Sequence, residues 1–189
     1  MLLHQDQSFK NIKWPADQTK KQEFENCTFI NCDLSNLIFS FCKFVDCVFT
    51  NCNLSMVKLG GCQLNNVTFK ESKLLGINFS ECSDFLFIVK FENCTLDYCS
   101  FVRRKMPQTS FSGCSMKSVD FTGSDLTKSK FSDTDLLNAV FMNTILKEAD
   151  FLTARNYSID PEMNSMKKAK FSLYGVAGLL HKYDIKVEQ

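Results

Sequence analysis

The sequence predicts an all-β solenoid, in which short extended segments coil around one apolar core. Three observations lead to this fold class. A large apolar residue stands at every fifth position over most of the chain, a small residue precedes it by two positions, and a turn-forming residue follows it by two. A period of five fits neither an α-helix nor a strand with alternating faces. It fits a chain that turns a corner after every short segment.

The large apolar positions, called centres below, form two runs, at residues 24–79 and 91–151. In the second run Phe alternates with Leu or Met, and in the first run residues twenty apart match, as in Leu34, Leu54 and Leu74. Four segments therefore close one square coil, and successive coils stack at the strand spacing of about 4.8 Å. The two runs predict about six coils and a rod of roughly 30 Å with a column of stacked side chains inside.

The position two before a centre, called the slot below, holds a small or β-branched residue in most segments. All ten cysteines fall there: Cys27, Cys32, Cys42, Cys47, Cys52, Cys62, Cys82, Cys94, Cys99 and Cys114. Their separations are multiples of five within each run, unlike the C-x2-C spacing of metal sites, so we interpret them as small buried hydrophobes. A hydroxyl in such a dry slot, as in Cys47→Ser, is expected to be unfavourable.

The position two after a centre, called the corner below, favours Asn, Gly and Asp. These residues turn the chain at low cost, either through a positive φ or through side-chain bonds to nearby backbone.

Segments such as 27–31, 32–36 and 124–128 resemble the pentapeptide-repeat family, in particular its Qnr- and MfpA-like bacterial members. The resemblance implies a right-handed quadrilateral parallel β-helix, which we assign to residues 24–156. Residues 1–23 are expected to form a degenerate N-terminal coil or cap, because Phe9 and Trp14 keep the phase of the first run.

The register slips by two residues within 80–90. One interpretation is a tolerated bulge at a corner. The other is an apolar contact for a partner, formed by a protruding Phe85 or Phe87.

A run of cations follows one coil later, at Arg103, Arg104 and Lys105. Arg104 takes a slot, where a charge cannot remain in a dry column, so the wall is expected to bulge outward there. The run is then either a solvated stretch or a candidate contact for a carboxylate-rich or phosphate-bearing partner.

Residues 157–189 are predicted to contain a loop, a last repeat and a short C-terminal α-helix that covers the open end of the solenoid. Ser172 can cap this helix, and apolar residues recur at helical spacing at Leu173, Val176, Ala177 and Leu180. The resemblance implies a homodimer through this tail. The candidate dimer contacts are Leu179, Tyr183, Ile185 and Val187.

No catalytic site, cofactor or metal is expected, and so no enzyme. His4 and His181 have no visible partner in the sequence, and no phosphate-binding glycine loop or nucleophile elbow occurs. Carboxylates that precede centres should point outward in regular columns, without a cleft to desolvate them. They include Asp33, Asp120, Asp135 and Asp150.

Charge and hydropathy exclude two further classes. With 22 Lys+Arg against 21 Asp+Glu, the chain is too nearly neutral for non-specific nucleic-acid binding. No apolar stretch approaches the roughly 18 residues that span a bilayer, and no signal peptide is recognisable. Reduced thiols in the slots agree with a cytoplasmic protein.

Two functions remain. The resemblance implies a non-enzymatic interaction module, most specifically a binder of DNA gyrase or topoisomerase IV that imitates duplex DNA and confers quinolone resistance. Imitation of DNA requires an acidic surface, which a net charge of +1 allows only as a one-sided stripe. The alternative is a rigid scaffold or spacer with an unidentified protein partner. Its polar columns are broken by apolar residues expected to be exposed: Phe41, Met56, Tyr98, Leu137 and Met142.

Overall fold

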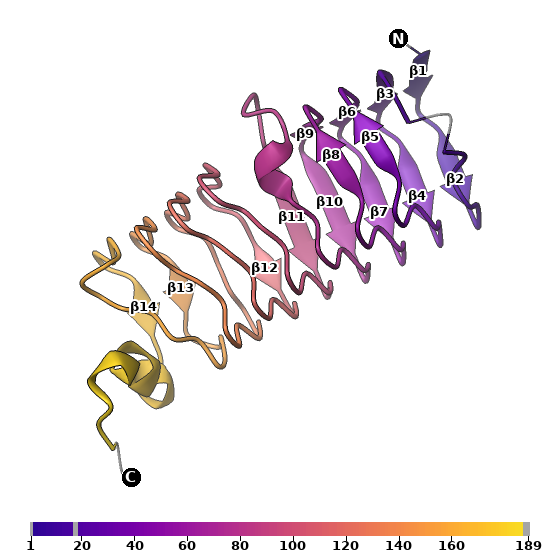
Figure 1. The fold of residues 1–189 in the computed structure, drawn as a ribbon. Helices are drawn as coiled ribbons and strands as arrows, with labels where there is room; N and C mark the ends of the chain where they lie inside the picture. The colour runs from indigo at the N-terminus through magenta and orange to yellow at the C-terminus, as the bar shows by residue number, and fades with distance from the viewer. Residues whose placement is uncertain (1, 17–18, 187–189) are drawn as a thin grey trace.

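The chain forms a right-handed parallel β-solenoid of about eight turns in the computed structural model, which describes residues 2–16 and 19–186. The two termini lie at opposite ends of a rod (Figure 1). Backbone pairing joins residues twenty apart, such as Phe29 with Phe49 and Phe24 with Phe44. The predicted quadrilateral β-helix is therefore confirmed. The rod is longer than the two runs alone require, because residues before Phe24 and after Phe151 also pair.

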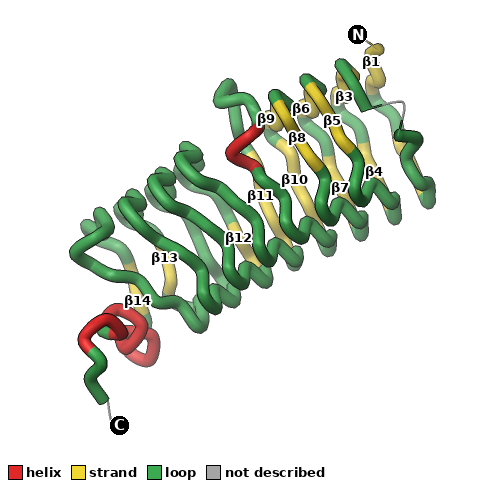
Figure 2. The backbone as a smooth tube through the Cα atoms, viewed as in Figure 1, coloured by secondary structure: helices red, strands yellow, loops and turns green. Residues whose placement is uncertain are grey.

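Regular strands concentrate on two sides of the solenoid. One sheet has the order β1-β3-β6-β9 and consists of Leu2–Gln5, Gln22–Glu25, Lys43–Val45 and Gln63–Asn65. A six-stranded sheet has the order β12-β11-β10-β7-β4-β2 and consists of Phe111–Ser112, Val89–Glu92, Val67–Lys70, Val48–Thr50, Thr28–Ile30 and Ser8–Lys10. Two pairs complete the strands: β5-β8 (Ile38–Ser40 and Lys58–Gly60) and β13-β14 (Asp150–Phe151 and Lys170–Phe171). Elsewhere single bridges join the coils, and Figure 2 draws these stretches as loop.

The N-terminal residues form a coil of their own. Strand β1 pairs with β3 and β2 with β4, while single bridges join Lys13 to Asp33 and Lys20 to Ser40. Trp14 is buried at the centre position of the third side.

The core is a set of stacked columns, and one column consists of phenylalanine alone. Neighbouring rings in it are stacked with centroids 4.3 to 5.5 Å apart. Its members are Phe9, Phe29, Phe49, Phe69, Phe91, Phe111, Phe131, Phe151 and Phe171. Rings of the adjacent column meet it edge-to-face, as Phe121 meets Phe111 at 5.9 Å. Such aromatic pairs contribute about 0.5–1.5 kcal/mol each beyond their buried area.

Corner residues adopt the left-handed conformation that the sequence predicts. Asn31, for example, has a φ of 54°, and its side-chain oxygen accepts a hydrogen bond from the side-chain Nδ2 of Asn51 at 2.8 Å. Gly61, with a φ of 64°, lies under the ring of Phe41 from the previous coil. A Cβ at Gly61 would come within 2.7 Å of that ring, so the corner needs glycine for space as well as for conformation.

A side chain in a slot can donate a hydrogen bond to a backbone carbonyl of the previous coil, and the sequence pattern does not reveal this acceptor. The thiol of Cys47 donates to the carbonyl oxygen of Phe24 in the previous coil, and the hydroxyl of Thr134 donates in the same way to Phe111 at 2.7 Å. Thr134 and Ser129 are fully buried. A buried hydroxyl in a slot keeps a partner, which reduces the desolvation cost expected for Cys47→Ser.

The C-terminal end is covered by 3₁₀ helices η2 (Leu173–Leu179) and η3 (His181–Tyr183) rather than by the predicted α-helix. Ser172 does cap the first helix, because its hydroxyl accepts from the amide of Gly175 at 3.1 Å. With three residues per turn, Gly175 and Gly178 fall on one face, and both lie against Tyr157. The predicted inward residue Leu173 is 85% exposed.

Candidate functional site

The register slip is an insertion of two residues into one coil. Pairing changes from twenty residues to 22 between β10 and β11, where Phe69 faces Phe91. Coil-to-coil backbone bonds stop after the amide of Ser83, which donates to Cys62, and resume at the amide of Ile88, which donates to Leu64. We call residues 82–88 the inserted segment. It follows 3₁₀ helix η1 (Phe79–Glu81) and projects beyond the neighbouring corners (Figure 1).

The inserted segment exposes three large apolar side chains within four positions. Phe85 is 65% exposed, Leu86 48% and Ile88 46%. Phe87 is only 8% exposed and packs edge-to-face on Phe79, with ring centroids 6.2 Å apart. Phe85 is thus placed as a protruding residue, whereas Phe87 is not available as a partner contact.

Arg104 is buried, with 2% exposure, and the predicted outward bulge does not occur. Its Nε donates to the carbonyl oxygen of Phe79 at 2.8 Å and its Nη1 to that of Ser83 at 3.3 Å. Its other bonds run from Nη2 to the carbonyl of Cys82 and from Nη1 to the carboxylate of Asp84. The guanidinium also lies 4.6 Å from the centroid of the Phe87 ring. A charge remains in this slot because carbonyl oxygens of the insertion surround it.

The cations beside Arg104 face solvent. Arg103 occupies a corner with a φ of 58°, beside Gly123 of the next coil, and Lys105 is exposed. Neither forms an ion pair within residues 2–16 and 19–186. The run of three cations is therefore not a single surface site.

Carboxylates on the sides of the rod do not stack into an acidic stripe. Each acid that precedes a centre pairs in the neighbouring coils with residues that are not acidic: Glu23 with Leu3 and Lys43, Asp33 with Lys13 and Asn53, Asp120 with Ser100 and Val140, Asp125 with Lys105 and Ile145, Asp135 with Ser115 and Arg155, and Asp150 with Lys130 and Lys170. They also bond locally, and the hydroxyl of Ser35, which donates to Asp33 at 2.7 Å, holds the pKa of that carboxyl below its usual range.

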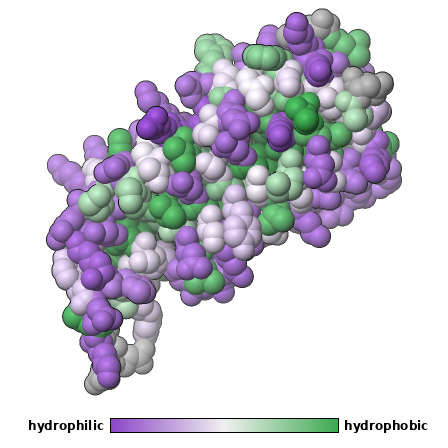
Figure 3. All heavy atoms as spheres, in the orientation of Figure 1, coloured by the Kyte–Doolittle hydropathy of each residue, from purple (hydrophilic) through white to green (hydrophobic). Residues whose placement is uncertain are grey.

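Large apolar residues also interrupt the polar columns elsewhere. The five that the sequence predicts to be exposed are exposed: Phe41, Met56, Tyr98, Leu137 and Met142. On the face drawn in Figure 3, apolar side chains lie between polar ones along the rod.

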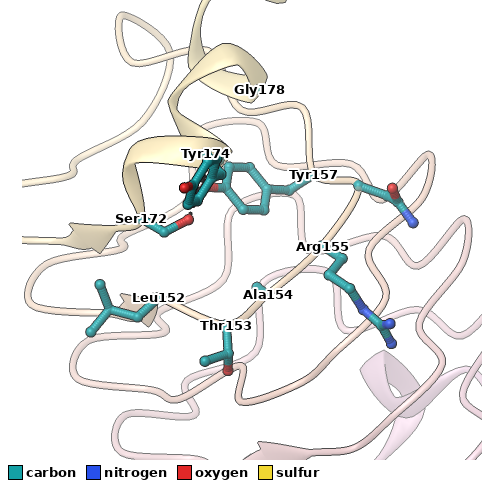
Figure 4. Close-up of a pocket in the computed structure, with 10 residues that line it drawn as sticks. Leu152, Thr153, Ala154, Arg155, Tyr157, Ser172, Tyr174 and Gly178 are labelled. Atoms are coloured by element: carbon teal, nitrogen blue, oxygen red, sulfur yellow. Dashed lines mark hydrogen bonds between the residues drawn. The ribbon is translucent and has the colours of Figure 1, made fainter. Parts of the chain in front are cut away.

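The C-terminal end has a hollow of about 420 Å³ between the last coil and η2 (Figure 4). Leu152, Arg155, Tyr157, Ser172 and Tyr174 are among the residues that line it. The buried hydroxyl of Tyr157 has no hydrogen-bond partner among the described residues, and burial raises its pKa. In Figure 4 the Arg155 side chain extends away from this hydroxyl, so the two do not converge on one site.

The candidate dimer contacts differ in exposure. Leu179 is half-buried against the core, whereas Tyr183 and Ile185 are exposed, and Val187 lies outside the described residues. Lys182 ties this end to the last coil, with its Nζ 2.8 Å from the carboxylate of Asp160. This contact holds the pKa of the Asp160 carboxyl below its usual range.

The described part of the chain offers no candidate metal site. No cluster there contains three or more potential metal ligands, and the ten cysteines are free and buried. Burial raises the pKa of the Cys47 thiol to about 12, so it is a poor nucleophile. The ring of His4 stacks on Phe24 at 4.7 Å. None of the helices described is long and apolar enough to cross a membrane.

Family models match most of the coiled region. A model described as pentapeptide repeat region matches residues 22–101, and one described as pentapeptide repeats (8 copies) matches residues 96–133 and 120–154. The chain belongs to the pentapeptide-repeat family. No curated protein matches this pentapeptide-repeat protein significantly.

The chain is similar to solved structures of other pentapeptide-repeat proteins. A trypsin-treated variant of QnrB1, a plasmid-mediated fluoroquinolone resistance protein, is 20% identical with a TM-score of 0.51, over 98% of this chain and 99% of that one. HetL, involved in heterocyst differentiation regulation in the cyanobacterium Nostoc sp. strain PCC 7120, is 15% identical with a TM-score of 0.46, over 89% of this chain and 86% of that one.

Proposed function

We propose that this pentapeptide-repeat protein is a non-enzymatic interaction module that docks a protein partner through the inserted segment. The observation that carries this proposal is the exposure of Phe85, Leu86 and Ile88 within four positions. Single exposed apolar residues are ordinary on a protein surface, but a group of them marks an interaction site. The rigid coils on both sides provide a fixed support for the group.

The partner that we propose to test first is a type II topoisomerase, DNA gyrase or topoisomerase IV, in the cytoplasm. The support is the rod-shaped fold and the family membership. Since the carboxylates are separated by neutral or basic neighbours, we propose that docking uses the apolar segment rather than an imitation of DNA phosphates, which follow one another every 1.7 Å or so along the duplex. Direct contact with nucleic acid or membrane is not part of this proposal.

The test is DNA gyrase supercoiling with the purified protein titrated in, with and without a fluoroquinolone. We expect inhibition, or rescue from the drug, at micromolar protein. The double variant Phe85→Ala, Leu86→Ala should need about tenfold more protein or greater, because truncating buried apolar anchors removes much of an interface's binding energy. The control is Phe41→Ala, which removes an equally exposed ring two coils away.

Two outcomes contradict the proposal. No effect of the parent up to tens of micromolar excludes the topoisomerase, and affinity capture from the native host would then look for the partner of a rigid scaffold. Equal activity of the parent and the double variant excludes the inserted segment as the contact.

We further propose that the protein is a homodimer through its C-terminal end, with Tyr183 and Ile185 in the interface. Light scattering at micromolar concentration is expected to give twice the chain mass of 21.6 kDa. Ile185→Glu should return the mass of one chain, because a charge in an apolar interface core is unfavourable. Ile145→Glu, at another exposed apolar position, is the matched control. If the parent protein has the mass of one chain, the homodimer is excluded.

A further inference from the structure

We propose that Arg104 is the positioning residue of the docking surface. It holds the inserted segment in one conformation, so that Phe85, Leu86 and Ile88 are presented together before a partner arrives. The docking role of the segment rests on the proposed function. The conformational role of Arg104 rests on its own contacts and can be measured without a partner.

The first step concerns the backbone groups that the insertion leaves without their usual donors. In the regular coils, the carbonyl of a slot residue accepts from an amide of the following coil, one position before the centre on the same side. Cys32 accepts in this way from Asn53 and Cys94 from Ser115, both at 2.9 Å. The corresponding donor for Cys82 is the amide of Lys105, and no such bond forms within the described residues. The Nη2 of Arg104 binds the Cys82 carbonyl instead.

The second step is that Arg104 also makes the ordinary slot bond. Cys99 donates to the carbonyl of Leu74, 25 residues earlier, and the Nε of Arg104 donates to the carbonyl of Phe79, again 25 residues earlier. Elsewhere a thiol or hydroxyl makes this bond across 23 residues. The two Nη atoms of the guanidinium extend beyond this bond, and their partners all lie in the inserted segment.

The third step is geometry. One side chain contacts the segment on both sides of the exposed pair Phe85 and Leu86, at residues 82–84 before the pair and at Phe87 after it. Only a planar fork with several donors reaches these acceptors together. The carboxylate of Asp84 is almost fully exposed, so the carbonyls rather than the ion pair account for the retention of the buried cation.

Between these anchors the segment has almost no other support. The amide of Phe85 donates to the hydroxyl of Ser83 at 3.2 Å, and the amides of Leu86 and Phe87 have no bond among the described residues. A segment ordered in advance loses less conformational entropy when it docks. Removal of the guanidinium is therefore expected to loosen the exposed group without opening the coils.

A double-mutant cycle tests the match between the insertion and the arginine. A chain that lacks Asp84 and Phe85 reads Cys82-Ser83-Leu86-Phe87-Ile88, a segment of regular length with Leu86 at the centre and Ile88 at the corner. Arg104→Ser is made in the parent and in this shortened chain, because serine fills the same slot at Ser124. The substitution should lower the Tm of the parent and raise that of the shortened chain, where ladder amides replace the guanidinium at the carbonyls. An equal Tm change in both chains overturns the proposal.

Hydrogen exchange provides the second measurement. In parent Arg104→Ser, the amides of the segment that are hydrogen-bonded in the parent, those of Ser83, Phe85 and Ile88, should exchange about tenfold faster or more, with those of 111–151 unchanged. Arg103→Ser, at the adjacent exposed arginine, should leave both regions unchanged. If Arg104→Ser does not fold, Arg104→Lys is used, since it keeps the charge without the fork. Unchanged exchange at these three amides in the folded variant overturns the positioning role. If the variant exchanges faster but acts on gyrase as the parent does, the inserted segment is not the docking surface. The conformational role of Arg104 is retained in that case.

Discussion

Phe121→Ala is expected to lower the free energy of unfolding by roughly 3–5 kcal/mol, the range for truncation of a fully buried aromatic side chain. Phe121 is completely buried, stacked between Phe101 at 5.4 Å and Phe141 at 5.1 Å. It also meets Phe111 and Phe131 edge-to-face. The upper part of the range is expected, because hydrogen bonds between the coils hold the neighbouring rings apart and leave the cavity open.

The measurement is equilibrium denaturation of parent and variant, with the slope of the transition compared to confirm that both unfold alike. Phe41→Ala is the matched control, since it removes the same ring from an exposed corner and should change stability by about 0.5 kcal/mol or less. If Phe121→Ala has the stability of the parent, the column does not depend on its aromatic packing.

Gly178→Ala is expected to displace the C-terminal cap. An added Cβ at Gly178 would lie 2.3 Å from the carbonyl oxygen of Tyr157, which is backbone and cannot rotate away. The carbonyl of Gly178 also accepts from the amide of Ile159 at 3.0 Å, so movement of η2 breaks a bond between cap and coil. Overpacking of this kind costs about 1–3 kcal/mol.

Limited proteolysis and hydrogen exchange across residues 173–183 measure this displacement. Gly60→Ala is the control, because a Cβ there meets nothing within 4 Å. A cap as protected in Gly178→Ala as in the parent would show that the contact with Tyr157 does not hold η2 in place.

The repeat pattern predicts the regular part of the fold because each position has one environment. Centres such as Phe24 and Leu126 must fill a column of fixed width, and both are completely buried. Corners such as Asn31 must adopt a positive φ. The chain spacing alone therefore determines which side chains face inward.

The irregular part escapes the pattern for physical reasons. Whether Phe85 or Phe87 protrudes depends on the local course of the insertion, which no period specifies. Arg104 was expected to leave the core because sequence spacing does not reveal backbone carbonyls that have lost their donors. A signal does exist: Arg104 lies 22 residues after Cys82, in the slot that follows the insertion by one coil. In the cap, Leu173 and Val176 fit a spacing of three as well as one of 3.6, so the sequence does not determine the helix type.

The constant register of the coils has a consequence for how the rod assembles and fails. Among the described residues, each coil pairs with its neighbours alone, at a sequence separation of twenty residues or 22 at the insertion. The entropy of closing one turn therefore does not grow as the rod lengthens, and folding can proceed by addition of coils to a nucleus, as in a one-dimensional lattice. Under tension applied at the two termini, the same lattice has no contact that bridges distant coils. The chain then unwinds from an end, one turn after another.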